Sequence, residues 1–169
     1  MSVGASIIGA LAGPRGPLAA AVIALALAMP SLVLPPLLDD HGFRFRLAVD
    51  ARGPLETFCF GSAANDGFAH RGPWWFDPNP PRICFMRPLS GLWHWVDYQL
   101  WPDATLWMRA QNCLLYAALV ALALLGYRRF GGSGRCVAFA GAMFALDEAH
   151  ASVLATIAGR NTLLWAALG

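Results

Sequence analysis

The feature that most constrains this chain is a run of 21 residues, Leu18 to Leu38, in which almost every position is Ala, Leu, Val, Ile or Pro. As an α-helix rising 1.5 Å per residue, such a run reaches across a hydrocarbon core about 30 Å thick. Pro30, Pro35 and Pro36 lie in its second half, so we expect its last turns to be kinked or unwound. The run therefore predicts a membrane-spanning segment.

The composition excludes an ordinary soluble domain. The 169 residues are 57% hydrophobic and only 13% charged, whereas about a quarter of the residues of a soluble domain are charged. We predict an all-α integral membrane protein, a polytopic helical bundle with a long first loop. All twelve basic residues are Arg, the net charge is only +2, and no basic stretch is interleaved with aromatic residues, so we expect no nucleic-acid partner.

Apolar runs and charged segments together give a predicted order of spans and loops. The predicted segments are an N-terminal segment 1–17, a first span 18–38, a long loop 39–107, a second span 108–127, a short loop 128–135, a third span 136–146, a polar segment 147–162 and the start of a fourth span 163–169. Seven residues cannot cross a bilayer. We therefore expect the chain to be the front portion of a longer protein.

The first apolar run has an alternative interpretation as a cleaved signal peptide. Arg15 would supply its basic start, and Ala26-Leu27-Ala28 resembles a small-residue cleavage site. The apolar run continues past Ala28 to Leu38 and the leader before it is long, which favours an anchor. Both interpretations place the following loop outside the cytoplasm.

The distribution of arginines predicts the topology of a multi-pass protein of the cell membrane. The short loop 128–135 has three Arg and no acid, whereas the long loop 39–107 has six Arg and eight acids, a net charge of 6 − 8 = −2. The positive-inside rule then places the N-terminus and the short loop in the cytoplasm. It places the long loop and the segment 147–162 on the outer side.

The long loop carries the signs of a membrane–water interface. Trp74-Trp75-Phe76 and several later tryptophans give it an aromatic load typical of that region. Apolar residues at helical spacing then predict an amphipathic interfacial helix over about 88–100. Cys59 and Cys84 both lie in this loop, where a disulfide is permitted, but the sequence leaves open whether they pair.

Acidic, basic and imidazole side chains gather on the predicted outer side. They are Asp39, Asp40, His41, Arg87, Asp147, Glu148, His150, Arg160 and Asn161. A carboxylate can remove a proton from an acceptor hydroxyl, while an Arg binds a phosphate at two points. The alternative is that these residues pair with each other and stabilise the loops. The histidines are scattered singly among the cysteines, so we predict no metal site.

Four segments together resemble a family of membrane enzymes. They are Leu37-Leu38-Asp39-Asp40-His41, Phe85-Met86-Arg87-Pro88-Leu89-Ser90, Trp95-Val96-Asp97-Tyr98-Gln99-Leu100-Trp101, and the stretch from Phe144 through Asp147-Glu148-Ala149-His150 to Gly159-Arg160-Asn161-Thr162-Leu163-Leu164. In order and spacing the chain resembles the N-terminal part of a multi-spanning GT-C-type glycosyltransferase, the superfamily that includes protein O-mannosyltransferases. It departs from the better-known relatives at Asp147-Glu148, where they have His-Pro, at Ser152, where they have Glu, and at Thr162, where they have Asp.

The resemblance implies a reaction and a set of roles. The donor would be a polyprenyl-phosphate-linked sugar, the acceptor a hydroxyl of a protein or glycan, and no cofactor would be needed. Asp40, either alone or together with Asp39, would act as the general base. Contacts to the donor phosphate would come from Arg160, Arg87, His150, Asn161 and His41. The alternative is a non-catalytic membrane protein, such as a transporter subunit, a scaffold or a degenerate relative, that uses the loop acids in structural ion pairs.

Overall fold

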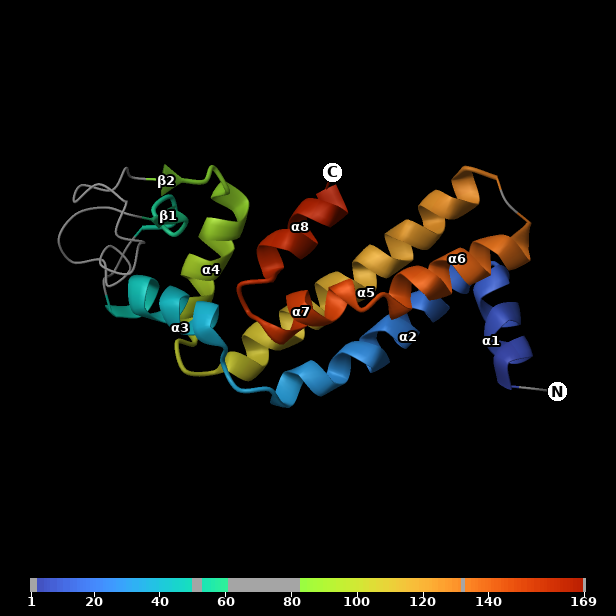
Figure 1. Cartoon of the computed structure of the whole chain (residues 1–169), viewed down its shortest axis with the longest axis horizontal. Coiled ribbons are helices and arrows are strands. Elements are labelled where there is room, and N and C mark those ends of the chain that lie inside the picture. The colour runs from blue at the N-terminus through green and yellow to red at the C-terminus, as the bar shows by residue number, and fades with distance from the viewer. Residues whose placement is uncertain (1–2, 50–52, 61–82, 132, 169) are drawn as a thin grey trace, which may run out of the picture. The chain divides into compact units, whose positions relative to one another are not determined.

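Two long helices, α2 (Gly16–Ala28) and α5 (Thr105–Arg129), run antiparallel beside each other at the centre of the larger part of the chain (Figure 1). The computed structural model describes residues 3–49, 53–60, 83–131 and 133–168. The chain divides into two units, one made of residues 1–41 and 104–169 and the other of residues 42–103. The α2–α5 pair belongs to the first unit.

The first span differs from its predicted range of 18–38. It begins at Gly16, and at Met29 the α-helix changes into a 3₁₀ helix, Met29–Val33. Pro30 fits the first turn of that helix, where its missing N–H is not needed. Leu34 is already extended, with φ −69° and ψ 143°, as expected of a residue that precedes Pro35. The helical part is therefore 16–33, and the prolines unwind its end as predicted.

The second span is longer than its predicted range of 108–127. Its helix α5 packs Tyr116, Val120 and Leu124 into a core with Ala24 and Ala28 of α2. Small residues one turn apart let two helix backbones approach closely, which is how helices associate within a membrane. Polar residues near the start of α5 made its true beginning, Thr105, hard to recognise.

Among the described residues, four further α-helices lie wholly in the first unit. α1 (Val3–Ala12) packs against α2 and α6 (Gly134–Leu146), so the segment predicted only as an N-terminus is part of the bundle. The predicted third span 136–146 starts two residues earlier, because Ser133 Oγ accepts a hydrogen bond from Cys136 N at 3.3 Å and caps the helix. The predicted polar segment contains α7 (Ala149–Ala155), and α8 (Arg160–Leu168) begins before residue 163.

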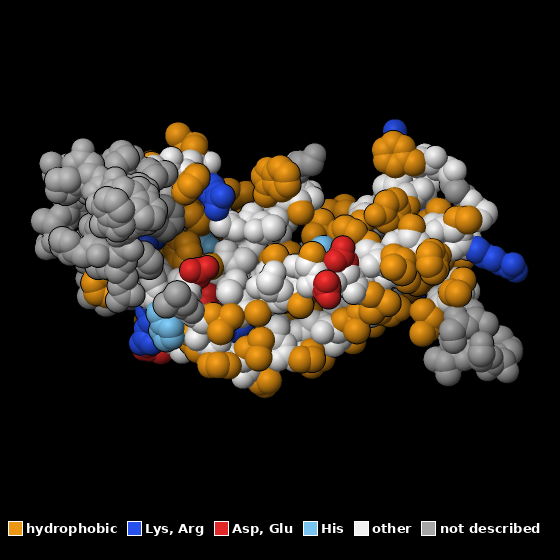
Figure 2. All heavy atoms as spheres, in the orientation of Figure 1, with side chains coloured by type: hydrophobic (Ala, Val, Ile, Leu, Met, Phe, Trp, Pro, Cys, Tyr) orange, Lys and Arg blue, Asp and Glu red, His pale blue; other side chains and the backbone are white. Residues whose placement is uncertain are grey.

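Within the described residues, two helices are long and apolar enough to cross a membrane, namely Gly16–Val33 and Thr105–Arg129. Their 18 and 25 residues correspond to about 27 and 37 Å of helix. α6 and α7 would make a third by length and composition if the pair, bent by 47° at its break, counts as one span. On the face shown in Figure 2, hydrophobic side chains are spread along the helices, which is consistent with a membrane location.

The described part of the second unit, residues 42–49, 53–60 and 83–103, is mainly helical and contains one short pair of strands. It contains the π-helical turn Phe45–Val49, which follows α3 (Leu38–Arg44), and the helix α4 (Pro88–Leu100). The strands β1 (Cys59–Phe60) and β2 (Ile83–Cys84) pair antiparallel with Cys59 opposite Cys84. A disulfide joins these two cysteines and answers the question that the sequence left open.

Helix α4 has the bounds expected from the sequence, but its polar face is the buried one. Ser90, His94 and Asp97 are buried, whereas Leu89 and Leu92 are about half exposed. The ring of His94 stacks on Phe43, with centroids 4.9 Å apart, and Phe58 packs on the edge of Phe43 at 5.3 Å. The expected aromatic cluster Trp74-Trp75-Phe76 lies outside the described residues.

Candidate functional site

Asp40 is the centre of a buried group of polar side chains in the first unit. It lies in the first turn of α3 and is only 2% exposed. Its Oδ1 accepts hydrogen bonds from the backbone N–H groups of Ile157 at 2.7 Å and Ala158 at 3.1 Å. Its Oδ2 accepts the backbone N–H of Leu37 at 3.1 Å, as in a capping box, and a side-chain N–H of Arg109 at 3.4 Å. Two carboxylate oxygens offer about four acceptor sites, so these donors occupy most of the capacity of Asp40.

Arg109 joins three segments that are far apart in sequence. It lies near the start of α5 and is fully buried. Its Nη1 donates to the carbonyl of Ala155 at 2.7 Å, and its Nη2 donates to the carbonyl of Pro35 at 2.8 Å and to Asp40. A buried guanidinium is tolerated only when it is paired and hydrogen-bonded. The negative charge of Asp40 and the carbonyl groups together meet that requirement.

Asn112 and Arg160 extend this group along α5. Asn112 lies one turn after Arg109, on the same face of the helix. Its Nδ2 donates to the carbonyl of Thr156 at 2.9 Å, and its Oδ1 accepts from Arg160 Nε at 3.0 Å. Arg160, with 0% exposure, also donates from Nη2 to the carbonyl of Met108 at 2.8 Å. Asp40, Arg109, Asn112 and Arg160 thus form one polar network.

The polar network holds the connection between α7 and α8 in one conformation. Residues 155–158 supply the carbonyl and N–H groups that Arg109, Asn112 and Asp40 bind. Thr156 Oγ1 also accepts the N–H of Gly159 at 3.0 Å. A Cβ added to Gly159 would lie 2.0 Å from the carbonyl oxygen of Val153, so only glycine fits this close approach. The Gly159-Arg160 pair of the predicted motif therefore has a structural explanation.

The two polar neighbours of Asp40 in the acidic motif are exposed. Asp39 and His41 flank Asp40 in α3, and both side chains are open to the surroundings. Within the part of the chain that the structure describes, the Asp39 carboxylate has no hydrogen bond or ion pair. Of the two acids expected to act together, one is therefore engaged inside the first unit and the other is free to meet a ligand.

The second acidic motif does not join the polar network. Asp147 and Glu148 are exposed, and Asp147 Oδ1 accepts the N–H of Ala149 at 2.9 Å, which supports the start of α7. His150 is half-buried between the rings of Tyr116 and Phe144, with centroids 5.2 and 4.9 Å away. Its Nε2 is buried and has no hydrogen-bond partner among the described residues. This histidine thus packs within the bundle rather than beside Asp40.

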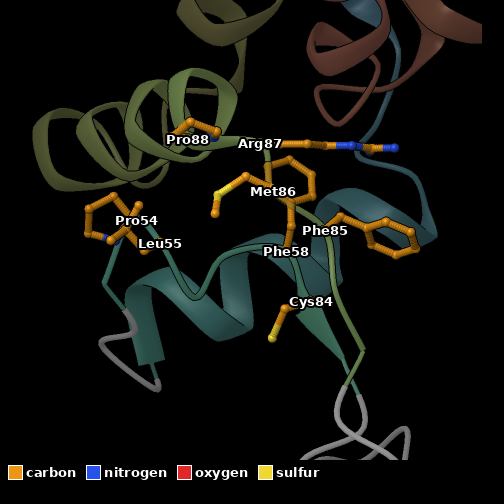
Figure 3. Close-up of a pocket in the computed structure, with 8 residues that line it drawn as sticks. All are labelled: Pro54, Leu55, Phe58, Cys84, Phe85, Met86, Arg87 and Pro88. Carbon is orange, nitrogen blue, oxygen red and sulfur yellow. The ribbon is translucent and has the colours of Figure 1, made fainter.

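Arg87 belongs to the second unit and is exposed. Its guanidinium carbon lies 5.4 Å from the ring centroid of Phe58 and 5.2 Å from that of Phe85, within the range of a cation–π contact. Figure 3 shows its side chain extended beside these rings, at a cavity of about 190 Å³ with mainly apolar walls. Asn161, the last predicted site residue, is partly exposed in the first unit and accepts a hydrogen bond from Thr162.

The most connected residues of the site, Arg109 and Asn112, were not among the predicted site residues. The signal available in the sequence was a pair of strongly polar residues at i and i+3 in the first turns of an otherwise apolar helix. Polar residues that face the interior of a membrane bundle are costly and are retained for a reason. Within the described ranges, no three His, Cys, Asp or Glu side chains lie close enough together to hold a metal ion.

The site presents the exposed carboxylate of Asp39 next to Asp40, whose hydrogen bonds hold this part of the backbone in place. Asp39 is attached through Asp40 to the α7–α8 connection and to α5, so its backbone position is well defined. An exposed carboxylate so placed can accept a proton or bind a cationic or hydroxyl group.

Comparisons with known protein families, with curated proteins and with solved structures find no match to this chain.

Proposed function

We propose that this chain acts as a membrane glycosyltransferase of the GT-C type, which transfers a sugar from a polyprenyl-phosphate donor to an acceptor hydroxyl on the outer side of the membrane. The observation that carries the proposal is the hydrogen bonding of Asp40 to the N–H groups of Ile157 and Ala158. It joins two of the four segments on which the resemblance rests, the acidic motif and the segment that leads into Gly159-Arg160-Asn161. They are separated by more than a hundred residues in the sequence.

In the proposed reaction, Asp39 is the base and Asp40 positions it. The Asp39 carboxylate takes the proton of the acceptor hydroxyl, and the acceptor oxygen forms a bond to the anomeric carbon of the sugar. The bond between that carbon and the phosphate oxygen breaks, and the lipid leaves as polyprenyl phosphate. Asp40 suits a supporting role because its oxygens already accept hydrogen bonds from Leu37, Arg109, Ile157 and Ala158.

The two predicted arginines differ as the two acids do, because one is buried and the other is exposed. Arg160 uses its donors on Asn112 and Met108 and is fully buried, so we propose that it positions the α7–α8 connection. Arg87, in the second unit, is exposed, so its donors are open to a phosphate. His41 and Asn161, both at least partly exposed, remain candidates for contacts to the sugar or the phosphate.

Two features support an active site on the outer side. The disulfide between Cys59 and Cys84 is of the kind that persists in oxidising compartments. The exposed leucines of α4 suit a helix that lies in the membrane interface, with its apolar face in the lipid and its polar face on the protein.

The second candidate function is a non-catalytic membrane protein that uses its acids for structural ion pairs. It is favoured by one observation, the buried pair of Asp40 and Arg109. In that case Asp39 has no catalytic role, and the chain transfers no sugar. The two proposals therefore differ in what they expect of the exposed Asp39 rather than of the buried Asp40.

The experiment compares Asp39→Asn with Asp40→Asn in the full chain, reconstituted with radiolabelled polyprenyl-phosphate mannose or polyprenyl-phosphate glucose and hydroxyl-bearing peptides. The measured quantity is radiolabel transferred to the peptide. We expect Asp39→Asn to lower the transfer rate by about a hundredfold or more with unchanged unfolding in detergent, and Asp40→Asn to lose both transfer and stability. Full transfer by Asp39→Asn, or no transfer by the unmodified chain with either donor, overturns the proposal.

A further inference from the structure

The acids and most of the arginines of the first unit lie at opposite ends of its helices. All four of its acids, Asp39, Asp40, Asp147 and Glu148, follow the C-terminal ends of the first span or of α6. Four of its six arginines, Arg15, Arg128, Arg129 and Arg135, lie instead at the start of α2, the end of α5 and the start of α6. On the face shown in Figure 2, basic side chains project where α1 and the start of α6 meet, and no acidic side chain is visible there.

One of these four arginines is structural. Arg128 Nη2 donates to the carbonyls of Leu11, at 2.9 Å, and of Gly13, and its Nη1 donates to that of Pro14 at 3.4 Å. The side chain thereby satisfies carbonyl groups at the C-terminal end of α1, which have no partner within the helix. It also fixes the turn between α1 and α2 against the end of α5.

The other three arginines each follow, in the sequence, a residue that lines a cavity at this end. It has a volume of about 250 Å³ and is lined by the α1–α2 turn, Arg128 and the start of α6, including Pro14 and Gly134. Pro14 and Gly134 are each followed by an exposed arginine, Arg15 and Arg135, and Arg129 follows Arg128. Among the described residues, none of these three exposed arginines makes a hydrogen bond or an ion pair. Their donors are free for a ligand.

We propose that this basic end, defined by Arg15, Arg129 and Arg135, is a binding site for the head group of an anionic phospholipid. The charge is complementary to a lipid phosphate, and arginine binds phosphate oxygens at two points. Arg15 and Arg129 stand at the ends of helices long enough to span the bilayer, which is the depth of the head groups, and Arg135 stands at the start of α6. Phe130 is 89% exposed beside Arg129, and aromatic side chains anchor proteins at this depth.

The lipid phosphate occupies the mouth of the cavity, with its acyl chains along the apolar surface of the helices. Basic residues next to spans attract anionic lipids by roughly 1 kcal/mol each, which corresponds to about a fivefold change in affinity per charge. Removal of three arginines is then expected to weaken binding by about a hundredfold at low salt. The effect should shrink as salt screens the charges.

The test is a titration of the purified full chain in detergent micelles with fluorescent phosphatidylglycerol, followed by anisotropy. We expect the variant with Arg15→Gln, Arg129→Gln and Arg135→Gln to bind about a hundredfold more weakly. The three corresponding Lys replacements keep the charge but not the two-point contact, so they should bind more weakly than the unmodified chain and more tightly than the Gln variant. The control Arg44→Gln should bind as the unmodified chain does. Circular dichroism verifies that each variant is folded. The proposal fails if the Gln variant binds equally well, if phosphatidylcholine competes as well as phosphatidylglycerol, or if millimolar inorganic phosphate displaces the lipid completely.

Discussion

Asp40 and Arg109 form an ion pair with 3.4 Å between Oδ2 and Nη2, and neither side chain is more than 1% exposed. The pair joins the segment after the first span to the beginning of the second, 69 residues later. Two opposite charges out of contact with water stabilise a protein only if further hydrogen bonds complete their coordination. Here Ile157, Ala158, Leu37, Ala155 and Pro35 supply those bonds.

The first prediction concerns the energy of this pair. Replacement of either partner, by Asp40→Asn or Arg109→Met, should lower the free energy of unfolding by about 3–5 kcal/mol, because one buried charge is left uncompensated. The double variant should lose less than the sum of the two single losses. Unfolding in detergent, followed by tryptophan fluorescence, measures these values.

The control for this prediction is Asp39→Asn. Asp39 is the neighbour of Asp40 in sequence but is exposed, so its replacement should change the free energy of unfolding by no more than about 0.5 kcal/mol. Equal losses for Asp39→Asn and Asp40→Asn would show that the pair has no special role.

The second prediction contrasts this pair with an exposed one. Arg44 and Asp103 form a salt bridge near the two chain ends of the second unit, with side chains 53% and 77% exposed. Exposed pairs contribute about 0–1 kcal/mol and are weakened by salt. A double-mutant cycle of Arg44→Ala and Asp103→Ala should give a coupling energy below about 1 kcal/mol. If its coupling energy equals that of Asp40 with Arg109, burial is not what distinguishes the two pairs.

The sequence predicted the helices well where apolar residues dominate. The bounds of α4 followed from Pro88 at its first turn and from leucines at helical spacing. The start of α5 was missed because Arg109 and Asn112 look like residues outside a span, whereas tertiary partners make them part of its buried face. α1 was not predicted, because its ten residues are too few to span a membrane and its packing against α6 has no local signal.

Of the four residues of the polar network, Asp40 and Arg160 were among the predicted site residues, and Arg109 and Asn112 were not. The acidic motif and the Gly159-Arg160 segment were expected on one side of the membrane, and hydrogen bonds of Asp40 join them. Which of two adjacent acids is buried depends on the conformation of the α7–α8 connection and on Arg109. A single sequence has no local pattern that distinguishes Asp39 from Asp40.

The third prediction concerns the glycine of that connection. In Gly159→Ala the new methyl group would meet the carbonyl oxygen of Val153 at 2.0 Å, so the backbone must move. Overpacking of this kind costs about 1–3 kcal/mol, and it should also displace Ile157 and Ala158 from Asp40. Hydrogen exchange followed by mass spectrometry should show faster exchange of the N–H groups of residues 155–160.

The matched control is Gly126→Ala in α5. A Cβ at Gly126 meets nothing within 4 Å, and alanine is favoured over glycine within a helix by about 1 kcal/mol. This variant should therefore be as stable as the unmodified chain or more stable. Unchanged exchange in Gly159→Ala would disprove the close approach.

The last prediction concerns the cysteines. The disulfide between Cys59 and Cys84 closes a loop with a sequence separation of 25, and the chain-entropy estimate for such a loop is about 3.5 kcal/mol. Reduction should lower the midpoint of thermal unfolding of the second unit. Cys136 is exposed and Cys113 buried, so an alkylating reagent should label Cys136 in the folded protein and Cys113 only after denaturation. Labelling of all four cysteines in the folded, unreduced protein would rule out the disulfide, and with it one support for an active site on the outer side.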